Sequence, residues 1–432
     1  MRKKTVVLCY LVLLFTTTMI FSQQFHTIFD HTFGGEGSDS IRCIQPTRDG
    51  GWIATGITTS RSRDLTGNFG GEDIWVIKLD PQGKIEWQRN YGGRRHDRGY
   101  WIEQTSDGGY ILAAATSSNE YDISGNHGTW DIWIAKLDPS GEIQWSRCYG
   151  GSQGDSPRKI MEDKAGGYIF TGYTFSNNHD VSNHKGGKDF WVVRLDRQGN
   201  ILWERTLGGS RYDQPYDIVQ LRDQTYAVVG YTFSNNGDVS DHYGNGDYWV
   251  VKLDRQGNIQ WEQNYGGRGW DEPRSMVATM DGGFVIAGGS SSPDGDVSNP
   301  KGNQDLWIIK IDRNGGLLWE RSYGGSRFDK AYSITETRDG GFVVVGITES
   351  NDGDVRTHHG GRDIWVLRLS RTGTLLRQHT IGTAADEGAE MVVMNADGTF
   401  TLAGGEYSVP GGEVAGEDGR RYKDFRIIHF RF

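Results

Sequence analysis

The stretch KLDPQGKIEWQRNYGG at residues 78–93 returns at residues 252–267 as KLDRQGNIQWEQNYGG. Each copy combines an Asp-x-x-Gly turn, a short alternating segment centred on Trp and a closing Gly-Gly pair. The pair recurs every 58 residues, beginning at Gly34, Gly92, Gly150, Gly208, Gly266 and Gly324, with Gly382-Thr383 as a degenerate seventh copy. A fixed period of this kind predicts one repeat array, although 432 residues would ordinarily imply two or three domains.

Each period carries four strand signals, named A to D here. Strand A is typified by residues 333–335, strand B by the apolar run 342–345, strand C by 363–367 and strand D by 259–262. Asp-Gly-Gly turns join A to B, and Leu-Asp-x-x-Gly turns join C to D, because Gly supplies the positive φ of a tight hairpin. Strand C begins with Asp-x-Trp at Asp73, Asp131, Asp189, Asp247, Asp305 and Asp363, and a late seventh copy is Asp424-Phe425-Arg426.

Four short antiparallel strands per period, repeated seven times, predict an all-β, seven-bladed β-propeller. The last period stops after a strand C equivalent at residues 424–432, whereas residues 25–33 precede the first Gly-Gly pair in the register of strand D. Phe29 stands there where Trp87 stands one period later. We therefore expect the N-terminal strand to complete the seventh blade and close the ring, which leaves no exposed sheet edge.

The N-terminal segment, the net charge and the cysteine count indicate the compartment and limit the classes of partner and fold. Residues 1–22 combine Arg2, Lys3 and Lys4 with an apolar stretch at residues 5–21, which predicts a cleaved signal peptide and a propeller over residues 23–432. A retained membrane anchor is the alternative, but the stretch is short for a span. Removal of residues 1–22 leaves a net charge of −13, so nucleic acid is not an expected partner. Three Cys exclude a disulfide-stapled fold.

Two kinds of repeated position, aromatic and acidic, invite a functional interpretation. The recurring Trp and strand B aromatics could stack on sugars, but their presence in nearly every period favours packing between blades. An acidic column lies five residues after the start of each Gly-Gly pair and could ring the channel mouth as a cation site. The alternative, which we favour, is that each carboxylate accepts N–H bonds from its own turn. The column comprises Asp39, Asp97, Asp155, Asp213, Asp271, Asp329 and Glu387.

The B–C loops carry Gly-Asp-Val-Ser motifs at residues 237–240 and 295–298. Their Asp and Asn content hints at calcium, but the alternating ligand spacing of an EF-hand loop is absent. Self-bonded loops are the favoured interpretation. Histidines also gather there, mostly one per blade, which favours solvated surface over a shared zinc site.

Function on a repeat scaffold is expected where the copies diverge on one face. Just before the acidic column, three successive periods carry Tyr212, Trp270 and Phe328, and Arg211 and Arg327 flank them. Exposed aromatics beside Arg indicate a glycan- or protein-binding patch, and the alternative is that these rings cover blade junctions. Three residues beyond the acidic column, Arg and Tyr alternate from blade to blade, which predicts a cation–π girdle near the channel mouth. The column reads Arg42, Tyr100, Arg158, Tyr216, Arg274, Tyr332 and Glu390.

The motif at residues 78–93 and 252–267 resembles the Gly/Trp-rich propeller repeats of secreted Bacteroidota proteins, which are often labelled bulb-type-lectin-like. Its Leu-Asp-x-x-Gly-x-x-x-Trp portion is also similar to the repeat of PQQ-type quinoprotein dehydrogenases and of the BamB-type assembly lipoprotein. Those dehydrogenases are typically eight-bladed with extra catalytic loops, and this chain has neither feature.

No nucleophile elbow, Ser-His-Asp set or Cys/His metal spacing stands out in the sequence. We therefore expect an exported, non-enzymatic scaffold that uses no cofactor and binds a protein or glycan on the face of the D–A and B–C loops, in the bacterial envelope or outside the cell. The alternative is a polysaccharide-active or cofactor-dependent, PQQ-like propeller enzyme.

Overall fold

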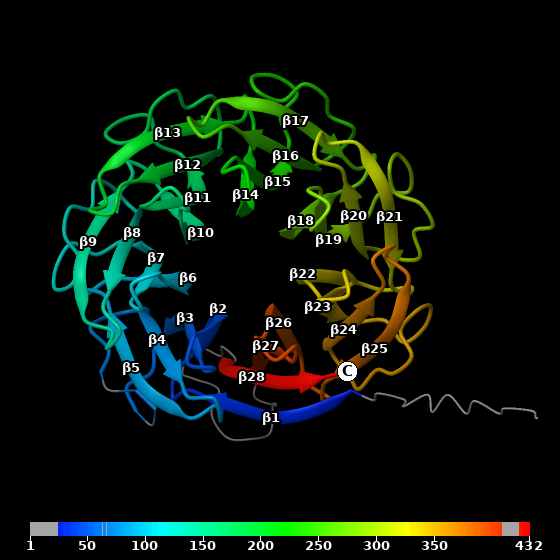
Figure 1. The fold of residues 1–432 in the computed structure, drawn as a ribbon, viewed down its shortest axis with the longest axis horizontal. Coiled ribbons are helices and arrows are strands. Elements are labelled where there is room, and N and C mark those ends of the chain that lie inside the picture. Colours follow the sequence, from blue (N-terminus) through cyan, green and yellow to red (C-terminus); the bar gives the residue numbers. More distant parts are fainter. Residues whose placement is uncertain (1–24, 63, 66, 408–422) are drawn as a thin grey trace, which may run out of the picture.

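The computed structural model describes residues 25–62, 64–65, 67–407 and 423–432. Within these residues every regular element is a β-strand, and the strands form seven four-stranded antiparallel sheets. Figure 1 shows the sheets arranged as blades around a central channel. The chain is therefore a seven-bladed β-propeller, as predicted. The predicted signal peptide at residues 1–22 lies outside the described residues.

The two inner strands of each blade follow the predicted order. Strand A lines the channel (Figure 1), and strand B pairs with it. The A strands are β2 (Asp39–Pro46), β6 (Asp97–Gln104), β10 (Asp155–Glu162), β14 (Asp213–Gln220), β18 (Asp271–Ala278), β22 (Asp329–Glu336) and β26 (Glu387–Met394). The B strands are β3 (Trp52–Thr58), β7 (Tyr110–Thr116), β11 (Tyr168–Thr174), β15 (Tyr226–Thr232), β19 (Phe284–Ser290), β23 (Phe342–Thr348) and β27 (Phe400–Tyr407).

The two outer strands complete each blade, and strand D forms the rim of the ring. The C strands are β4 (Asp73–Leu79), β8 (Asp131–Leu137), β12 (Asp189–Leu195), β16 (Asp247–Leu253), β20 (Asp305–Ile311), β24 (Asp363–Leu369) and β28 (Lys423–Arg431). The D strands are β5 (Ile85–Tyr91), β9 (Ile143–Tyr149), β13 (Ile201–Leu207), β17 (Ile259–Tyr265), β21 (Leu317–Tyr323), β25 (Leu375–Ile381) and, in the last blade, β1 (His26–Phe33). Blades are numbered 1 to 7 from β2.

The ring closes through its N-terminal strand. β1 pairs antiparallel with β28, so blade 7 has the order β1-β28-β27-β26. Phe29 takes the place of the strand D Trp of other blades. Its ring centroid lies 5.5 Å from that of Trp52, across the junction from blade 7 to blade 1. In the same way, the ring centroid of Trp203 in blade 3 lies 6.0 Å from that of Tyr226 in blade 4. The predicted closure is confirmed.

The hydrophobic core lies between blades. The Trp of each Asp-x-Trp motif is fully buried in blades 1 to 6. In blade 4, the ring of Trp249 lies 4.8 Å from that of Phe190 in blade 3, and its Nε1 donates to Glu262 Oε2 at 2.8 Å. The repeated aromatics therefore act as wedges between sheets, which is the packing role predicted for them.

Candidate functional site

A β-bulge in every A strand builds the wall of the channel. In β14, Pro215 pairs with Gly230 and Asp217 pairs with Val229, so Tyr216 between them has no partner in β15. A bulge of this kind turns the extra residue out of the sheet's alternation and re-aims its side chain. The same interruption occurs at the equivalent residue of all seven A strands, namely Arg42, Tyr100, Arg158, Tyr216, Arg274, Tyr332 and Glu390.

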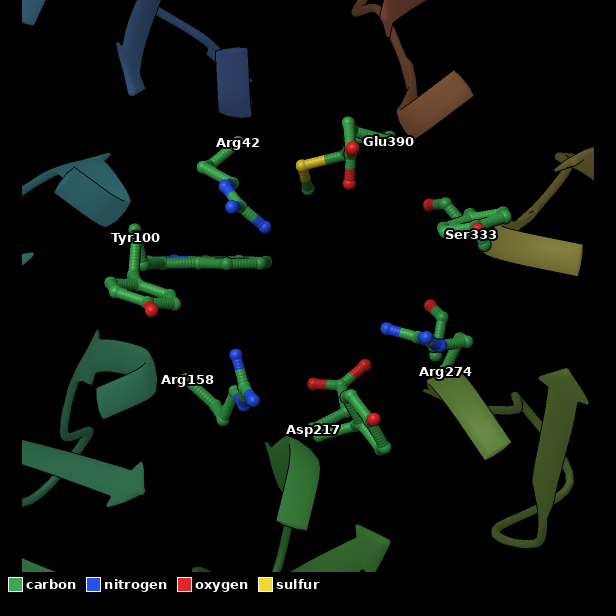
Figure 2. A pocket seen from close by; sticks show the side chains of 12 residues that line it. Arg42, Tyr100, Arg158, Asp217, Arg274, Ser333 and Glu390 are labelled. Atoms are coloured by element: carbon green, nitrogen blue, oxygen red, sulfur yellow. The ribbon is translucent and has the colours of Figure 1, made fainter. Parts of the chain in front are cut away.

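These seven bulged residues, here called the girdle, line one cavity in the channel. Figure 2 shows Arg42, Tyr100, Arg158, Arg274 and Glu390 around it. Guanidinium groups alternate with phenol rings as the sequence predicted. The Arg158 Cζ lies 5.5 Å from the centroid of Tyr100 and 5.3 Å from that of Tyr216. Arg274 continues the series, at 4.5 Å from Tyr216 and 5.2 Å from Tyr332. Cation–π contact therefore links neighbouring blades around the girdle.

On the Arg274 side of the girdle, the guanidinium is paired with a carboxylate. Glu272 accepts from Arg274 at 2.8 Å and from the Tyr216 hydroxyl at 2.6 Å, and it also pairs with Lys330. Burial raises the pKa of Glu272, but Arg274 and Lys330 outweigh burial and hold it below its usual value. Burial, followed by repulsion from Arg274, lowers the pKa of Lys330 to about 8. Nearby, Lys159 pairs with Asp217 at 2.7 Å.

The acidic column is used inside each blade. Asp213, for example, is fully buried and accepts from Gly209 N and Ser234 Oγ, both at 2.8 Å, and from Thr232. The other members accept from the equivalent turn N–H at 2.7–3.0 Å, namely Asp39, Asp97, Asp155, Asp271, Asp329 and Glu387. These carboxylates thus hold the D–A turns, and over the described ranges no group of three or more His, Cys, Asp or Glu is arranged to hold a metal ion.

A second set of carboxylates meets at each blade junction. At Gly266, a Cβ would collide with the carboxylates of Asp271 and Asp247, and the amide N donates to Asp296 Oδ2 at 3.1 Å. Asp247 Oδ1 has no hydrogen-bond partner among the described residues. Burial, followed by the charges of Asp271 and Asp296, raises the pKa of Asp247 to about 7. The same unpaired atom occurs on Asp73, Asp131, Asp189, Asp305 and Asp363.

These raised pKa values predict that stability falls as pH rises. The pKa of Asp73 is also raised to about 7 and that of Asp131 to about 6, mainly by burial. An unfolded aspartate releases its proton near pH 4, so between about pH 4 and pH 7 unfolding releases protons and becomes easier at higher pH. We expect the melting temperature to decrease over this range and to level off above it.

The variant Asp247→Asn tests this expectation. Asn keeps an acceptor for Tyr243 N, at 2.6 Å in the native chain, but carries no charge. It should raise the melting temperature at pH 8 and change it little at pH 4.5. The control Asp241→Asn, at an exposed residue of the same loop, should leave the profile unchanged. Identical profiles for the native chain and Asp247→Asn would contradict the assignment.

The B–C loops are fastened to the D–A turns of their own blade. In blade 4, Asp238 N donates to Gly208 O at 2.9 Å, and Gly208 N donates back to Asp238 Oδ2 at 3.1 Å. The predicted self-bonded loop is therefore present at this position. Loops of adjacent blades also touch, because the rings of His127 and His179 lie 5.0 Å apart.

The predicted aromatic patch lies at three successive junctions on the D–A and B–C face. Tyr212, Trp270 and Phe328 each form a parallel bridge to the preceding blade, through Lys188, Gly246 and Gln304 respectively. Trp270 is half-buried, with its ring 5.1 Å from those of Tyr231 and Phe233. Tyr212 is 53 % exposed. The rings therefore cover junctions and at the same time present surface.

The flanking arginines are exposed. Arg211 donates to Phe233 O at 3.1 Å, and its Cζ lies 5.6 Å from the ring of the same residue. Arg327 donates only its backbone N–H, to Ser350 Oγ at 3.0 Å, among the contacts of the described chain. Arg211 thus sits on the patch, whereas the Arg327 guanidinium reaches into solvent.

Sequence reasoning missed the residues beneath the patch. Tyr173 and Phe175 in blade 3 repeat as Tyr231 and Phe233 in blade 4. Lys188 lies 4.2 Å from the centroid of Tyr173 and donates to Gln214 Oε1 at 2.8 Å. Burial and then Arg158 lower its pKa to about 8. The signal was available, because at the same 58-residue step the other described blades carry Ile57, Ala115, Gly289, Ile347 and Gly405 in place of Tyr173.

The strand order and the channel lined by the girdle define a seven-bladed β-propeller, and its D–A and B–C face carries the aromatic patch at three of the blade junctions. The comparisons with known proteins concern this fold. No family model matches the chain. It resembles the WD40 domain of Pan2 from Neurospora crassa, with a TM-score of 0.51 at 12% identity, over 94% of this chain and 95% of that one. Sqt1 from Chaetomium thermophilum gives a TM-score of 0.47 at 13% identity, over 91% and 86% of the two chains.

One curated relative also matches. The regulatory protein FlaEY of Caulobacter vibrioides is 23% identical over an alignment of 250 residues, and the match covers 51% of this chain. The matched region spans about a quarter of that protein, at 26% of its length. No helix in the described residues is long and apolar enough to cross a bilayer.

Proposed function

We propose that this protein is an exported, non-enzymatic scaffold that binds a protein or glycan on the face of the D–A and B–C loops. The observation that carries the proposal is where the repeats differ. Positions that are constant around the ring hold turns and blade wedges, whereas the divergent aromatics gather at the junctions of blades 3/4, 4/5 and 5/6. A propeller is consistent with a protein-binding scaffold, and binding residues are often carried on loops that a rigid scaffold positions.

The chemistry of the patch favours a ligand with both apolar faces and polar groups. Tyr212 offers an exposed ring, Trp270 offers a half-buried ring held by two others, and Arg211 supplies donors beside them. Rigid aromatics flanked by Arg are the residues that most often dominate binding energy. The same arrangement suits the apolar face and hydroxyl groups of a sugar ring.

The export proposal rests on residues 1–22, with cleavage near Ser22. The resemblance to secreted Gly/Trp-rich propeller repeats supports the same compartment. The proposal covers both the periplasm and the extracellular space, because a signal peptide begins export to either compartment.

Binding of the protein to a glycan array, followed by titration of any ligand found, tests the proposal. We expect Tyr212→Ala and Trp270→Ala to weaken binding about tenfold or more, which corresponds to about 1.4 kcal/mol. Met280→Ala is the matched control, since Met280 is 60 % exposed in an A–B turn on the opposite face. Melting temperatures should show that the Tyr212→Ala chain folds like the native one.

Two outcomes would contradict the proposal. Conversion of a bound glycan into product would show an enzyme in place of a scaffold. Equal losses for Tyr212→Ala and Met280→Ala would place the ligand away from the patch.

A further inference from the structure

Among the described residues, guanidinium groups without an ion pair occur on one side of the girdle only. Arg274 is paired with Glu272, whereas Arg42 and Arg158 form no ion pair with any of the described residues. Tyr100 stands between them, with the Arg42 Cζ 5.7 Å and the Arg158 Cζ 5.5 Å from its centroid. In Figure 2 both guanidinium groups point into the same cavity.

Arg158 is the more constrained of the two. Its Nε is buried and has no hydrogen-bond partner in the described chain. The rings of Tyr100, Tyr173 and Tyr216 lie 5.3–5.5 Å from its Cζ. Buried donors are almost always satisfied in folded proteins. An oxygen acceptor from outside the chain would satisfy this donor.

The pKa of Tyr100 is shifted by the same unpaired positive charges. Burial raises the pKa of Tyr100, but Arg158 and Arg42 outweigh burial and the net shift is downward. Tyr216, beside Glu272, shows the opposite: burial raises its pKa, and the net shift stays upward. The two sides of one girdle thus differ in potential, and the Arg42–Tyr100–Arg158 side favours negative charge.

We propose that the cavity between Arg42, Tyr100 and Arg158 binds one small oxyanion, either inorganic phosphate or a small carboxylate. Guanidinium forks match the oxygen geometry of both groups. This site is one side of the cavity that the whole girdle lines. That cavity has a volume of about 120 Å³, which exceeds the room that one water needs and suits a group of a few heavy atoms. The site lies on the channel wall, and Tyr173 is the residue that it shares with the aromatics beneath the patch.

Two carboxylates on the same cavity set the expected affinity. Asp217 is occupied by Lys159, so its charge is largely compensated. Glu390 is the seventh girdle residue and forms no ion pair within the described residues. Its negative charge repels an anion, which predicts moderate affinity. Removal of this charge should therefore strengthen binding, whereas removal of an Arg charge should weaken it.

Calorimetric titration with sodium phosphate and, separately, sodium acetate at constant ionic strength tests the proposal. We expect the native chain to bind at least one of them with a Kd below about 10 mM, and Arg158→Gln to weaken that binding about tenfold or more. Arg371→Gln, at an exposed residue of a C–D turn, should bind like the native chain. Phosphate alone would identify a tetrahedral ligand, and acetate alone would identify a planar one.

Glu390→Gln should tighten binding severalfold, because it removes the opposing charge at nearly constant shape. If Arg158→Gln does not fold, Arg42→Gln replaces it, since Arg42 is exposed and tolerates substitution. Absence of binding by the native chain, or equal binding by the native chain and the Arg variant, would overturn the proposal. So would weaker binding by Glu390→Gln.

Discussion

A chain that begins at Gly34 instead of Phe25 is expected to lose on the order of 5 kcal/mol of folding stability, or to become insoluble. This truncation removes β1, whose Phe29 and Phe33 pack on the blade 1 and blade 7 core and whose Asp30 pairs with Arg426 at 2.8 Å. Each buried aromatic contributes about 1.5–3 kcal/mol, and the lost strand pairing adds to this. Thermal unfolding by circular dichroism measures the effect against a chain that begins at Phe25.

The truncated chain should also self-associate. Without β1, the edge of β28 is unpaired from Phe425 to Arg431, and the side chains of Phe425, Ile427 and Phe430 lie in the core beside it. Exposed apolar edges pair with other chains. Size-exclusion chromatography should therefore show concentration-dependent dimers or aggregates. A monomer with an unchanged melting temperature would mean that the seventh blade is stable with three strands.

Replacement of Trp249 by Ala is the point substitution with the largest expected effect, about 3–5 kcal/mol. Trp249 is fully buried, packs with its ring tilted against that of Phe190 in blade 3 and belongs to the cluster that joins blades 3 and 4. Its removal leaves a cavity at a blade junction, where sheets cannot collapse without breaking the ring. The guanidinium midpoint measures the loss.

Trp261→Ala in the same blade is the matched control. Trp261 is half-exposed on strand D and contacts Phe284 with ring centroids 6.3 Å apart. Its loss should cost clearly less, about 1–2 kcal/mol, because much of its surface is already in water. Equal effects of the two substitutions would show that the junction wedge has no special role.

The fold was predictable because one period governs local and global structure together. The turn at residues 80–83 and the Asp-x-Trp of strand C recur at the same step. A strand or turn assigned wrongly in one copy can therefore be recognised by comparison with the other copies. The closure was predictable for a different reason. Phe29 stands at the strand D position of a period that otherwise lacks its outer strand.

The site was less predictable because it depends on departures from regular geometry. The Arg–Tyr column is visible in the sequence, but alternation along a strand does not reveal that Tyr216 is an extra, bulged residue. The raised pKa of Asp247 likewise needs three segments to meet, at residues 247, 271 and 296. The aromatic support at Tyr231 and Phe233 was present in the sequence, yet its contact with Trp270 follows only from the junction geometry.

The pairing of β1 with β28 also determines when the ring can close during translation. Asp30 and Arg426 are 396 residues apart in the chain. At a ribosomal rate of about 5–20 residues per second, the first strand waits roughly 20–80 s for its partner. During that interval blades 1 to 6 can form in order while β1 lacks its strand partner β28. The ring therefore becomes complete only when the last strand is made, and a nascent chain is held open until then.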